Sequence, residues 1–313
     1  MKPCSFGAMI APLRKVFSAI GFIALLLAPL SAAPVLAANA AHANSLHAKP
    51  ALWRVQGKGG SVTLFGSVHV LPAGIDWQTP ELMAAFKAAD VVVFEIPVDS
   101  ALQTALVKAR DTQGTLPAGK TLASQLSPTA RANFAKVVGQ LNWSEAALAD
   151  KRPWLVSLLL DTAVMRQSGM TEAGPDFVLM QRAKDAGKTV RYLETVDQQM
   201  ALLVPADPVT ERQMLEDSLQ DFPHAVAELK GLVAAWAKGD ARGVDAAVGQ
   251  DMADYPALRG QFLTDRNRNW VRQIGAMAGE KKNVLVVVGV GHLVGPDSVP
   301  ALLRAEGFKV TGP

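Results

Sequence analysis

Three short apolar runs stand out in this 313-residue chain, and they predict the strands of a buried sheet. They are residues 61–67 (SVTLFGS), 91–94 (VVVF) and 283–288 (NVLVVV). The run at 91–94 is unbroken and favours a strand that is covered on both faces. The first and last runs lie near opposite ends of the chain, so we expect both ends to contribute to one sheet.

The pattern around these runs predicts the elements that complete the sheet. Residues 52–56 and the first apolar run, joined by the glycine-rich segment 57–60, are typical of a β-hairpin. Residues 80–89 have helical spacing and begin with a proline, which suits the first turn of a helix. A helix over 299–305 and a strand over 308–311 close the chain.

The stretch from about 100 to 280 is mostly helical in its pattern, with one short strand expected at 189–193. Prolines predict breaks between these helices, and they are Pro117, Pro153, Pro175, Pro205, Pro208, Pro223 and Pro256. We therefore predict an α/β (α+β) domain over residues 51–313. It has a central mixed sheet, built from N- and C-terminal segments, and a large helical insertion.

Residues 1–37 have the pattern of a secretory signal peptide. An apolar run over 19–28 and the helix breaker Pro29 are followed by small residues, so cleavage is expected after Ala37 or Ala40. The basic residues that precede the run are Lys2, Arg14 and Lys15. The run has about half the length that spans a membrane. We expect a periplasmic or secreted protein with no stable membrane anchor after cleavage.

The chain that follows the signal is balanced in charge and holds no cysteine. The signal carries three of the 31 basic residues and none of the 28 acidic ones, which leaves the remainder neutral. We therefore expect no nucleic-acid partner. Cys4 lies within the signal, which excludes thiolate chemistry in the mature chain. Residues 38–50, with His42 and His47, predict a flexible, solvated lead-in.

The candidate chemistry lies at the ends of two predicted strands. Gly66–His69 and Gly289–His292 are both Gly-x-x-His segments, and each follows an apolar run. Ligands bind at the carboxyl ends of strands in parallel sheets, and histidine suits metal binding or proton transfer near neutral pH. Two histidines that only bond to backbone would give the same spacing, and the residues alone leave both interpretations open.

Two carboxylates follow strands in the same way. Glu95 ends the run VVVF, and Glu194 follows the strand expected at 189–193. A set of Glu95, His69 and His292 can hold a divalent metal with open positions for water and substrate. Without a metal, the same three residues could act as a general base and an orienting acid. Glu194 is either a further ligand or a partner that orients a histidine.

The order of these segments resembles the TraB/PrgY/GumN family over roughly residues 50 to 313. The matching segments are Leu52-Trp53-Arg54-Val55, Phe65-Gly66-Ser67-Val68-His69, Val93-Phe94-Glu95, Gly174-Pro175-Asp176, Gln181 to Thr195, Gln198, Asp265-Arg266-Asn267-Arg268-Asn269-Trp270, Val288-Gly289-Val290-Gly291-His292-Leu293 and Gly295-Pro296-Asp297. The wider group contains the Tiki proteases. The resemblance therefore implies a metal-dependent hydrolase, similar to a peptidase, that acts on a peptide or another small molecule.

The resemblance also implies an active centre of His69, His292 and Glu95 that binds zinc, manganese or cobalt. Arg266 and Asn267 match the family's Arg-Asn pair and are expected beside that centre. The guanidinium there could hold a substrate carboxylate or an oxyanion. These five residues form the predicted catalytic set, and the first three are the predicted metal ligands.

Two other functions stay open. A protein of this family could bind a peptide or aid a pathway without catalysis, or it could be a metal-free esterase with one histidine as general base. The sequence has no Gly-x-Ser-x-Gly elbow and no phosphate-binding glycine loop, which argues against a serine hydrolase or a nucleotide enzyme. We expect His224 to be structural. Pro175 departs from the family pattern, which puts a role for the adjacent Asp176 in doubt.

Overall fold

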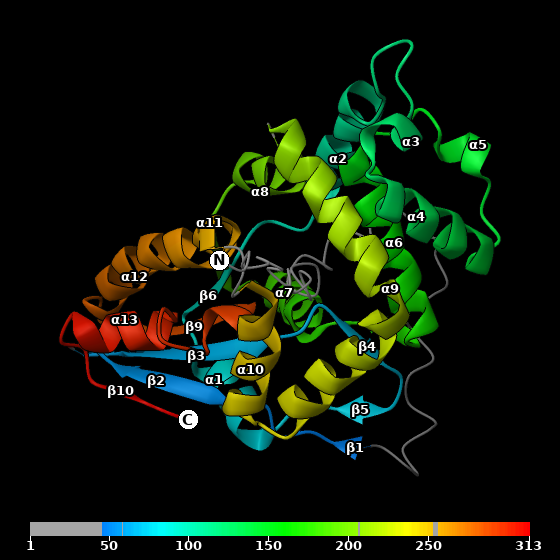
Figure 1. Ribbon diagram of the computed structural model, residues 1–313. Coiled ribbons are helices and arrows are strands. Elements are labelled where there is room, and N and C mark those ends of the chain that lie inside the picture. The colour runs from blue at the N-terminus through cyan, green and yellow to red at the C-terminus, as the bar shows by residue number, and fades with distance from the viewer. Residues whose placement is uncertain (1–45, 58, 206, 253–255) are drawn as a thin grey trace, which may run out of the picture.

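The computed structural model describes residues 46–57, 59–205, 207–252 and 256–313 (Figure 1). The predicted signal peptide, residues 1–37, and His42 lie outside the described residues. Within the described ranges, no helix is both long and apolar enough to cross a membrane.

A six-stranded mixed sheet forms the centre of the fold, as the sequence predicted. Its strands lie side by side in the order β10 (Val310–Thr311), β2 (Leu52–Gln56), β3 (Ser61–Ser67), β9 (Asn283–Gly289), β6 (Val91–Phe94) and β8 (Thr189–Tyr192). Strands β3, β9, β6 and β8 are parallel, whereas β2 is antiparallel to both of its neighbours. The first and last strong strands, β3 and β9, pair directly, so both ends of the chain build the middle of the sheet.

The register places the carboxyl ends of the parallel strands close to one another. Ser67 at the end of β3 pairs with Gly289 at the end of β9, and Phe94 at the end of β6 pairs with Tyr192 at the end of β8. Phe94 also pairs with Val287, two residues before the end of β9. Residues that follow these four strands therefore emerge along one edge of the sheet.

The middle of the sheet is covered on both faces, which explains why β6 and most of β9 are apolar. Every residue of β6 is buried, and so are Val284 to Val288 of β9. The covering helices are α1 (Pro80–Ala88), α7 (Pro175–Asp185), α12 (Asp265–Ala278) and α13 (Val299–Ala305). Figure 1 shows α12 and α13 lying together over the sheet.

Several helices begin with a capping residue that is followed by a proline in the first turn. The Thr79 hydroxyl accepts from the Leu82 N–H ahead of α1, and the Ser127 hydroxyl accepts from the Ala130 N–H ahead of α4. Proline then occupies the first turn of each helix, where its missing N–H is not needed. The sequence therefore marks the starts of these helices well.

The predicted helical insertion forms a second layer with a core of its own. Its helices are α2 (Ser100–Gln113), α3 (Leu122–Gln125), α4 (Pro128–Gln140), α5 (Glu145–Leu148), α6 (Pro153–Gln167), α8 (Val196–Leu203), α9 (Pro208–Ala237), α10 (Ala241–Met252), α11 (Pro256–Arg259) and the π-helical turn Gly260–Thr264. The second core includes Phe134, Leu160 and Phe222, from α4, α6 and α9. Figure 1 shows α2 to α6 rising to one side of the sheet, whereas α10 and α11 lie beside it.

The predicted break at Pro223 is wrong, because α9 runs through it from Pro208 to Ala237. Proline removes one N–H from a helix and often bends it. Helix α9 packs along α6, α4 and α10, and these tertiary contacts hold it helical on both sides of Pro223. Figure 1 shows α9 changing direction along its length.

Two pairs of short strands lie outside the main sheet. Strand β1 (Leu46–His47) pairs with β5 (Ile75–Asp76), and β4 (Val70–Pro72) pairs with β7 (Met170–Ala173). The prediction of a flexible lead-in over 38–50 is therefore wrong for its described end. Leu46 and His47 pair with β5, and Ala48 is buried. Strand β7 was not predicted, and it ties the helical layer to the chain that leaves β3.

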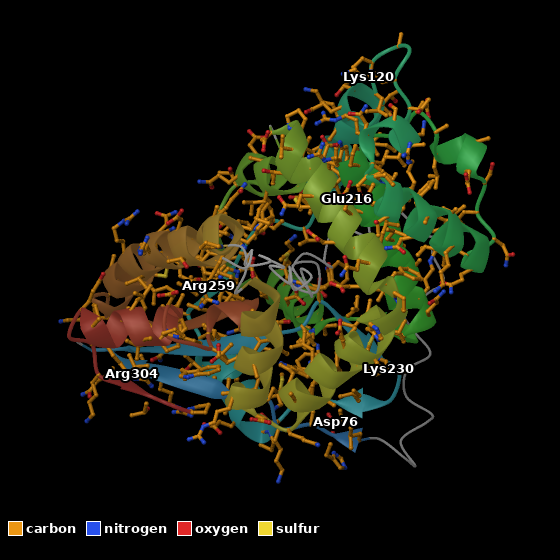
Figure 2. All side chains as sticks on the ribbon, viewed as in Figure 1. Asp76, Lys120, Glu216, Lys230, Arg259 and Arg304 are labelled. Atoms are coloured by element: carbon orange, nitrogen blue, oxygen red, sulfur yellow. The ribbon has the colours of Figure 1, made fainter. Side chains whose placement is uncertain are left out.

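Charged side chains are distributed over the surface of both layers. Figure 2 shows the labelled basic residues Lys120, Lys230, Arg259 and Arg304 well separated across the view. This distribution agrees with the balanced charge of the sequence.

Candidate functional site

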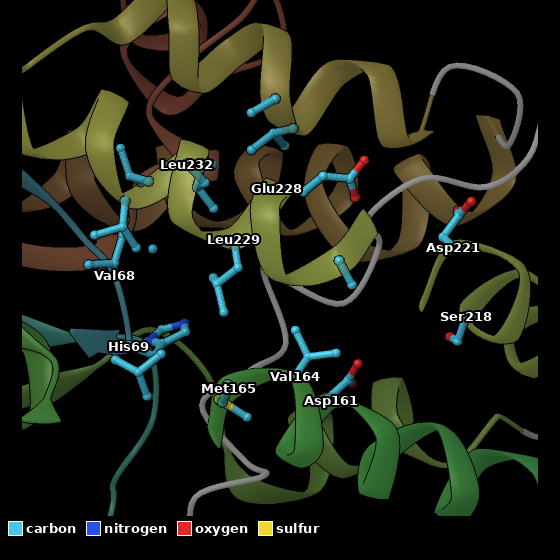
Figure 3. A pocket seen from close by; sticks show the side chains of 18 of the residues that line it. Val68, His69, Asp161, Val164, Met165, Ser218, Asp221, Glu228, Leu229 and Leu232 are labelled. Carbon is cyan, nitrogen blue, oxygen red and sulfur yellow. The ribbon is translucent and has the colours of Figure 1, made fainter. Parts of the chain in front are cut away.

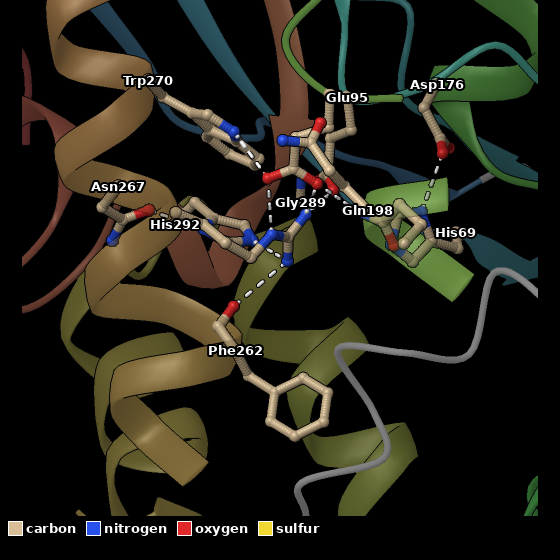
Figure 4. Close-up of polar contacts among 12 residues, drawn as sticks. His69, Glu95, Asp176, Gln198, Phe262, Asn267, Trp270, Gly289 and His292 are labelled. Carbon is tan, nitrogen blue, oxygen red and sulfur yellow. Dashed lines mark hydrogen bonds and ion pairs between the residues drawn. The ribbon is translucent and has the colours of Figure 1, made fainter. Parts of the chain in front are cut away.

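The carboxyl ends of the four parallel strands bring together residues that are far apart in the sequence (Figure 4). His69 follows β3, Glu95 follows β6, Glu194 follows β8 and His292 follows β9. Gly289 lies at the centre of this group. A Cβ atom on Gly289 would lie 3.1 Å from Glu95 Oε1 and 3.8 Å from His69 Nε2. The convergence of the two histidines and Glu95 is the arrangement that the sequence suggested.

Glu95 is fixed in its ionised form. Its Oε1 atom accepts the Gly289 N–H at 2.6 Å, and its Oε2 atom accepts from Arg266 Nη2 at 2.7 Å. Burial alone would raise the pKa of Glu95, but the Arg266 charge, with smaller contributions from the two histidines and the Gly289 N–H, lowers it to about 2. Glu95 therefore carries a negative charge at neutral pH.

Arg266 is the hub of the site. A guanidinium has five N–H donors, and Arg266 directs them to two oxygens of Glu194 (2.8 and 3.1 Å), to Glu95, to His292 Nε2 (3.0 Å) and to the Phe262 carbonyl (3.1 Å). Burial lowers the pKa of Arg266, but the charges of Glu95 and Glu194 outweigh burial and raise the pKa above its ordinary value. Arg266 therefore stays charged. Arg266 thus contacts both His292 and Glu95 at the strand ends. The sequence suggested that the guanidinium would bind a substrate carboxylate or an oxyanion. In the structure its N–H groups donate to other residues of the protein.

His292 is held as a neutral imidazole. Its Nδ1 atom lies 2.6 Å from Asn267 Oδ1, and the Asn267 amide nitrogen donates to the Asp297 carbonyl at 2.9 Å. Nδ1 therefore carries the proton, and Nε2 accepts from Arg266. Burial, followed by the Arg266 charge, lowers the pKa of His292 to about 3. The Trp270 ring, with its centroid 4.2 Å away, covers the imidazole.

His69 has the opposite environment. Its Nδ1 atom lies 2.7 Å from Asp176 Oδ2, and Asp176 Oδ1 accepts from the Ser67 hydroxyl at 3.0 Å. Burial lowers the pKa of His69, but the charge and hydrogen bond of Asp176, together with the Glu95 charge, outweigh it and raise the pKa. The Nδ1 proton of His69 therefore points to the Asp176 carboxylate.

Asp176 reaches His69 because α7 begins against the end of β3. The Gly174 N–H donates to the His69 carbonyl at 2.8 Å, and any Cβ on Gly174 would overlap the Val68 carbonyl oxygen. Pro175 then starts α7, and Asp176 lies in its first turn. The doubt about Asp176 that rested on Pro175 is corrected: proline suits this position, and Asp176 lies in the site.

One face of α12 supplies the other half of the site. Arg266, Asn267 and Trp270 lie on neighbouring positions of the helix surface, and all three contact the group around His292. Trp270 also donates to Glu194 Oε1 at 2.8 Å, and its ring lies 4.8 Å from the Arg266 guanidinium carbon. The sequence pattern did not predict this role of Trp270. Its spacing of four from Arg266, which places both on one helix face, was the available signal.

Some predicted groups lie elsewhere. Exposed His47 pairs with Asp76 between β1 and β5, and His224 is exposed on α9. Gln198, part of the resemblance, accepts from the Thr195 N–H while the Thr195 hydroxyl accepts from the Gln198 N–H. These reciprocal bonds cap α8, so Gln198 has a structural role here.

The predicted metal ligands do not fit a metal ion in this arrangement. Glu95 Oε2 and His292 Nε2 both bond to Arg266, and Glu95 Oε1 bonds to the Gly289 N–H. Within the described ranges, no three His, Cys, Asp or Glu side chains are grouped so that they could hold a metal. A cation bound by His69, His292 and Glu95 would require Arg266 to withdraw, so the metal centre stays a prediction.

The fold and the site define a mixed α/β protein with a histidine, carboxylate and arginine cluster at the carboxyl ends of parallel strands. The model of the TraB/PrgY/gumN family matches residues 51–312, and the chain belongs to this family. The chain is similar to YbaP of Escherichia coli K12 and of Shigella flexneri, both described as uncharacterised. The identity is 24% over 243 residues, which cover 77% of this chain and 87% of each relative. No solved structure matches the chain.

Proposed function

We propose that the protein is an exported hydrolase of carboxylic ester or amide bonds, with His69 as the group that moves the proton. The observation that carries this proposal is the opposed state of two neighbouring histidines. The pKa of His69 is raised, whereas that of His292 is lowered to about 3. Titratable groups whose environments push their pKa values apart are a sign of assigned roles in proton transfer. Export rests on the pattern of residues 1–37.

In the proposed reaction, neutral His69 accepts a proton from water through Nε2 as the water oxygen attacks the substrate carbonyl. The Asp176 carboxylate, 2.7 Å from Nδ1, fixes the tautomer and stabilises the imidazolium that forms. The imidazolium then returns the proton to the leaving oxygen or nitrogen as the carbonyl bond to that atom breaks. The products are a carboxylic acid and an alcohol or amine.

The other residues of the predicted catalytic set position the centre in this proposal. Glu95 is ionised and contributes to the raised pKa of His69, so its charge also stabilises the imidazolium. Arg266 fixes the place of Glu95 and keeps His292 neutral. Asn267 fixes the orientation of the His292 ring. No step of the proposed reaction passes through a metal, because Arg266 engages His292 Nε2 and Glu95 Oε2 and the Gly289 N–H engages Glu95 Oε1.

The test is a screen of aryl esters and short peptide amides with the purified protein, with His69→Gln and with His47→Gln as a matched exposed control. We expect turnover by the wild type and the control, and a loss of about 10²- to 10⁴-fold in His69→Gln with the fold retained. Equal turnover by all three proteins would contradict the role of His69. No turnover of any substrate would favour the binding-protein alternative.

Removal of metal distinguishes a metal-free hydrolase from a metal-dependent one. We expect activity to persist after treatment with a chelator, and the metal content by mass spectrometry to be unrelated to activity. Activity that is lost with the chelator and restored by zinc, manganese or cobalt would support the metal centre. It would also require Arg266 to leave Glu95 and His292.

A further inference from the structure

A cavity opens beside the cluster, between the ends of β3 and β9 and the helices α6, α9 and α10 (Figure 3). Its volume is about 120 Å³, and both His69 and His292 line it. The cavity lies where the core of the sheet meets the core of the helical layer. Leu232 and Val248 belong to the first core, and Leu160 and Phe222 belong to the second. A molecule in this cavity would therefore touch the proposed reacting histidine.

The cavity is apolar next to the histidines. Val164 and Met165 of α6 face Leu229 and Leu232 of α9 across it. Figure 3 shows Leu229, Val164 and Met165 between His69 and the carboxylates farther along the cavity. Burial of an apolar chain here would stabilise the complex, and the gain grows with each CH₂ group that leaves water. The part of the ligand next to the reacting bond is therefore expected to be apolar.

The far part of the cavity is acidic. Carboxylates line it from two helices: Asp161 from α6, and Asp217, Asp221 and Glu228 from α9. Apart from His69 and His292, the described residues that line the cavity include no basic side chain. On α9 these acids share one face with Leu229 and Leu232, because their spacing follows the helical repeat. The cavity thus changes from apolar to negative along a single helix face.

Asp161 supplies an independent sign that this acidic end is built for a ligand. Its Oδ2 atom is buried and has no hydrogen-bond partner among the residues that the structure describes. Burial raises the pKa of the Asp161 carboxyl well above its usual range. A buried polar atom without a partner destabilises the fold, and a bound cation would supply the missing partner.

We propose that this cavity binds the apolar part of the substrate, and that this part ends in a cation, an ammonium or a guanidinium, held by Asp161, Asp221 and their neighbours. The inference rests on the proposed function, because it makes the cavity the substrate site of the same His69 centre. It names a substrate class: esters or amides whose acyl or leaving group is an aliphatic or aromatic chain with a positive end.

Charge complementarity selects this class over its alternatives. A carboxylate at the end of the chain would meet other acidic groups, and repulsion between like charges in a poorly solvated site opposes its binding. A neutral chain would fill the apolar section but would leave Asp161 Oδ2 without a partner. An apolar chain with a cationic end fits both parts of the cavity. The chain covers Leu229 and Leu232, and the positive end reaches the acidic residues.

The test measures binding by calorimetry with three probes of equal chain length: octylammonium, octanol and octanoate. At pH 7 a primary ammonium is fully charged. We expect octylammonium to bind at least tenfold more tightly than octanol, and octanoate to bind most weakly. In the double variant Asp161→Asn, Asp221→Asn this preference should fall at least tenfold. Asp185→Asn, an exposed acid on α7, is the control and should retain it.

The result that overturns the inference is equal binding of octylammonium and octanol, no binding of octylammonium, or a preference that survives in the double variant. The comparison of probes on the wild type does not depend on the folding of any variant. Calorimetry follows binding and not turnover, so the two proposals fail separately. A protein that prefers octylammonium but hydrolyses nothing contradicts the proposed reaction alone. Hydrolysis without a preference for cationic substrates contradicts this inference alone.

Discussion

The two Gly-x-x-His segments are alike in sequence and opposite in chemistry. His69 faces Asp176 across a 2.7 Å hydrogen bond, which helps to raise its pKa. His292 faces the Arg266 guanidinium at 3.0 Å and rests against Trp270, and its pKa is lowered to about 3. His69 therefore takes up a proton more readily than an ordinary histidine, whereas His292 stays neutral.

The difference shows that the partner of the Nδ1 or Nε2 atom, and not the motif, decides what each histidine can do. His69 receives a carboxylate from α7, which the chain reaches through Gly174 and Pro175. His292 receives an amide and a guanidinium from α12. Both helices are remote in sequence from the histidine that they serve, with the longer separation on the His69 side.

The largest effect is expected from removing the guanidinium that separates the two environments. Arg266→Ala leaves Glu95 and Glu194 as buried charges without their partner, and such a loss costs about 3–5 kcal/mol of unfolding free energy. Arg272→Ala, an exposed arginine on the same helix, should change it by about 0–1 kcal/mol. Chemical denaturation of both variants measures the difference, and equal stabilities would show that Arg266 is not the hub.

Acid should destabilise the protein through His292 and Glu95. Unfolded histidine takes up a proton near pH 6.5, but folded His292 does so only near pH 3, so the unfolding free energy falls as the pH falls between these values. One proton changes it by about 1.4 kcal/mol per pH unit. Glu95, with its pKa lowered from 4.5 to about 2, adds a further loss below pH 4.5.

His69 acts in the opposite direction, because a raised pKa stabilises the fold at low pH and this contribution is lost as the pH rises through the folded value. Denaturation curves from pH 7 to pH 4 should therefore have a shallower pH dependence in His292→Gln than in the wild type. An unchanged slope would mean that His292 is not held neutral in the fold.

The smallest change is expected from Asp176→Asn. The amide keeps a neutral hydrogen bond to His69 Nδ1 but removes the charge, at a net cost of about 1 kcal/mol of unfolding free energy. The pKa of His69 should fall, since burial then acts with less opposition. Titration of the imidazole signals by NMR measures this shift, with Asp185→Asn on the exposed end of α7 as the control. A pKa that stays raised in Asp176→Asn would remove Asp176 from the explanation.

Much of the sheet and its edge could be predicted from single segments. The apolar runs at β3, β6 and β9 predicted buried strands, and β3 was predicted with its observed bounds, Ser61–Ser67. Strand ends also predicted that His69, His292 and Glu95 would lie together. Asp176 was doubted because the sequence alone does not show that Pro175 begins a helix against β3. The helix through Pro223 was missed because its packing against α6 and α10 outweighs a local preference.

The sequence by itself determined which strands are buried, where many of the helices begin, and which family's pattern the chain follows. These features depend on local periodicity, on capping residues and on the order of short motifs, all of which act over a few positions. Only the tertiary structure decided the partners of the two histidines, the five acceptors of Arg266 and the acidic end of the cavity. Hydrogen bonds and charges act over a few ångströms of space, and that distance is set by how remote helices pack on the sheet.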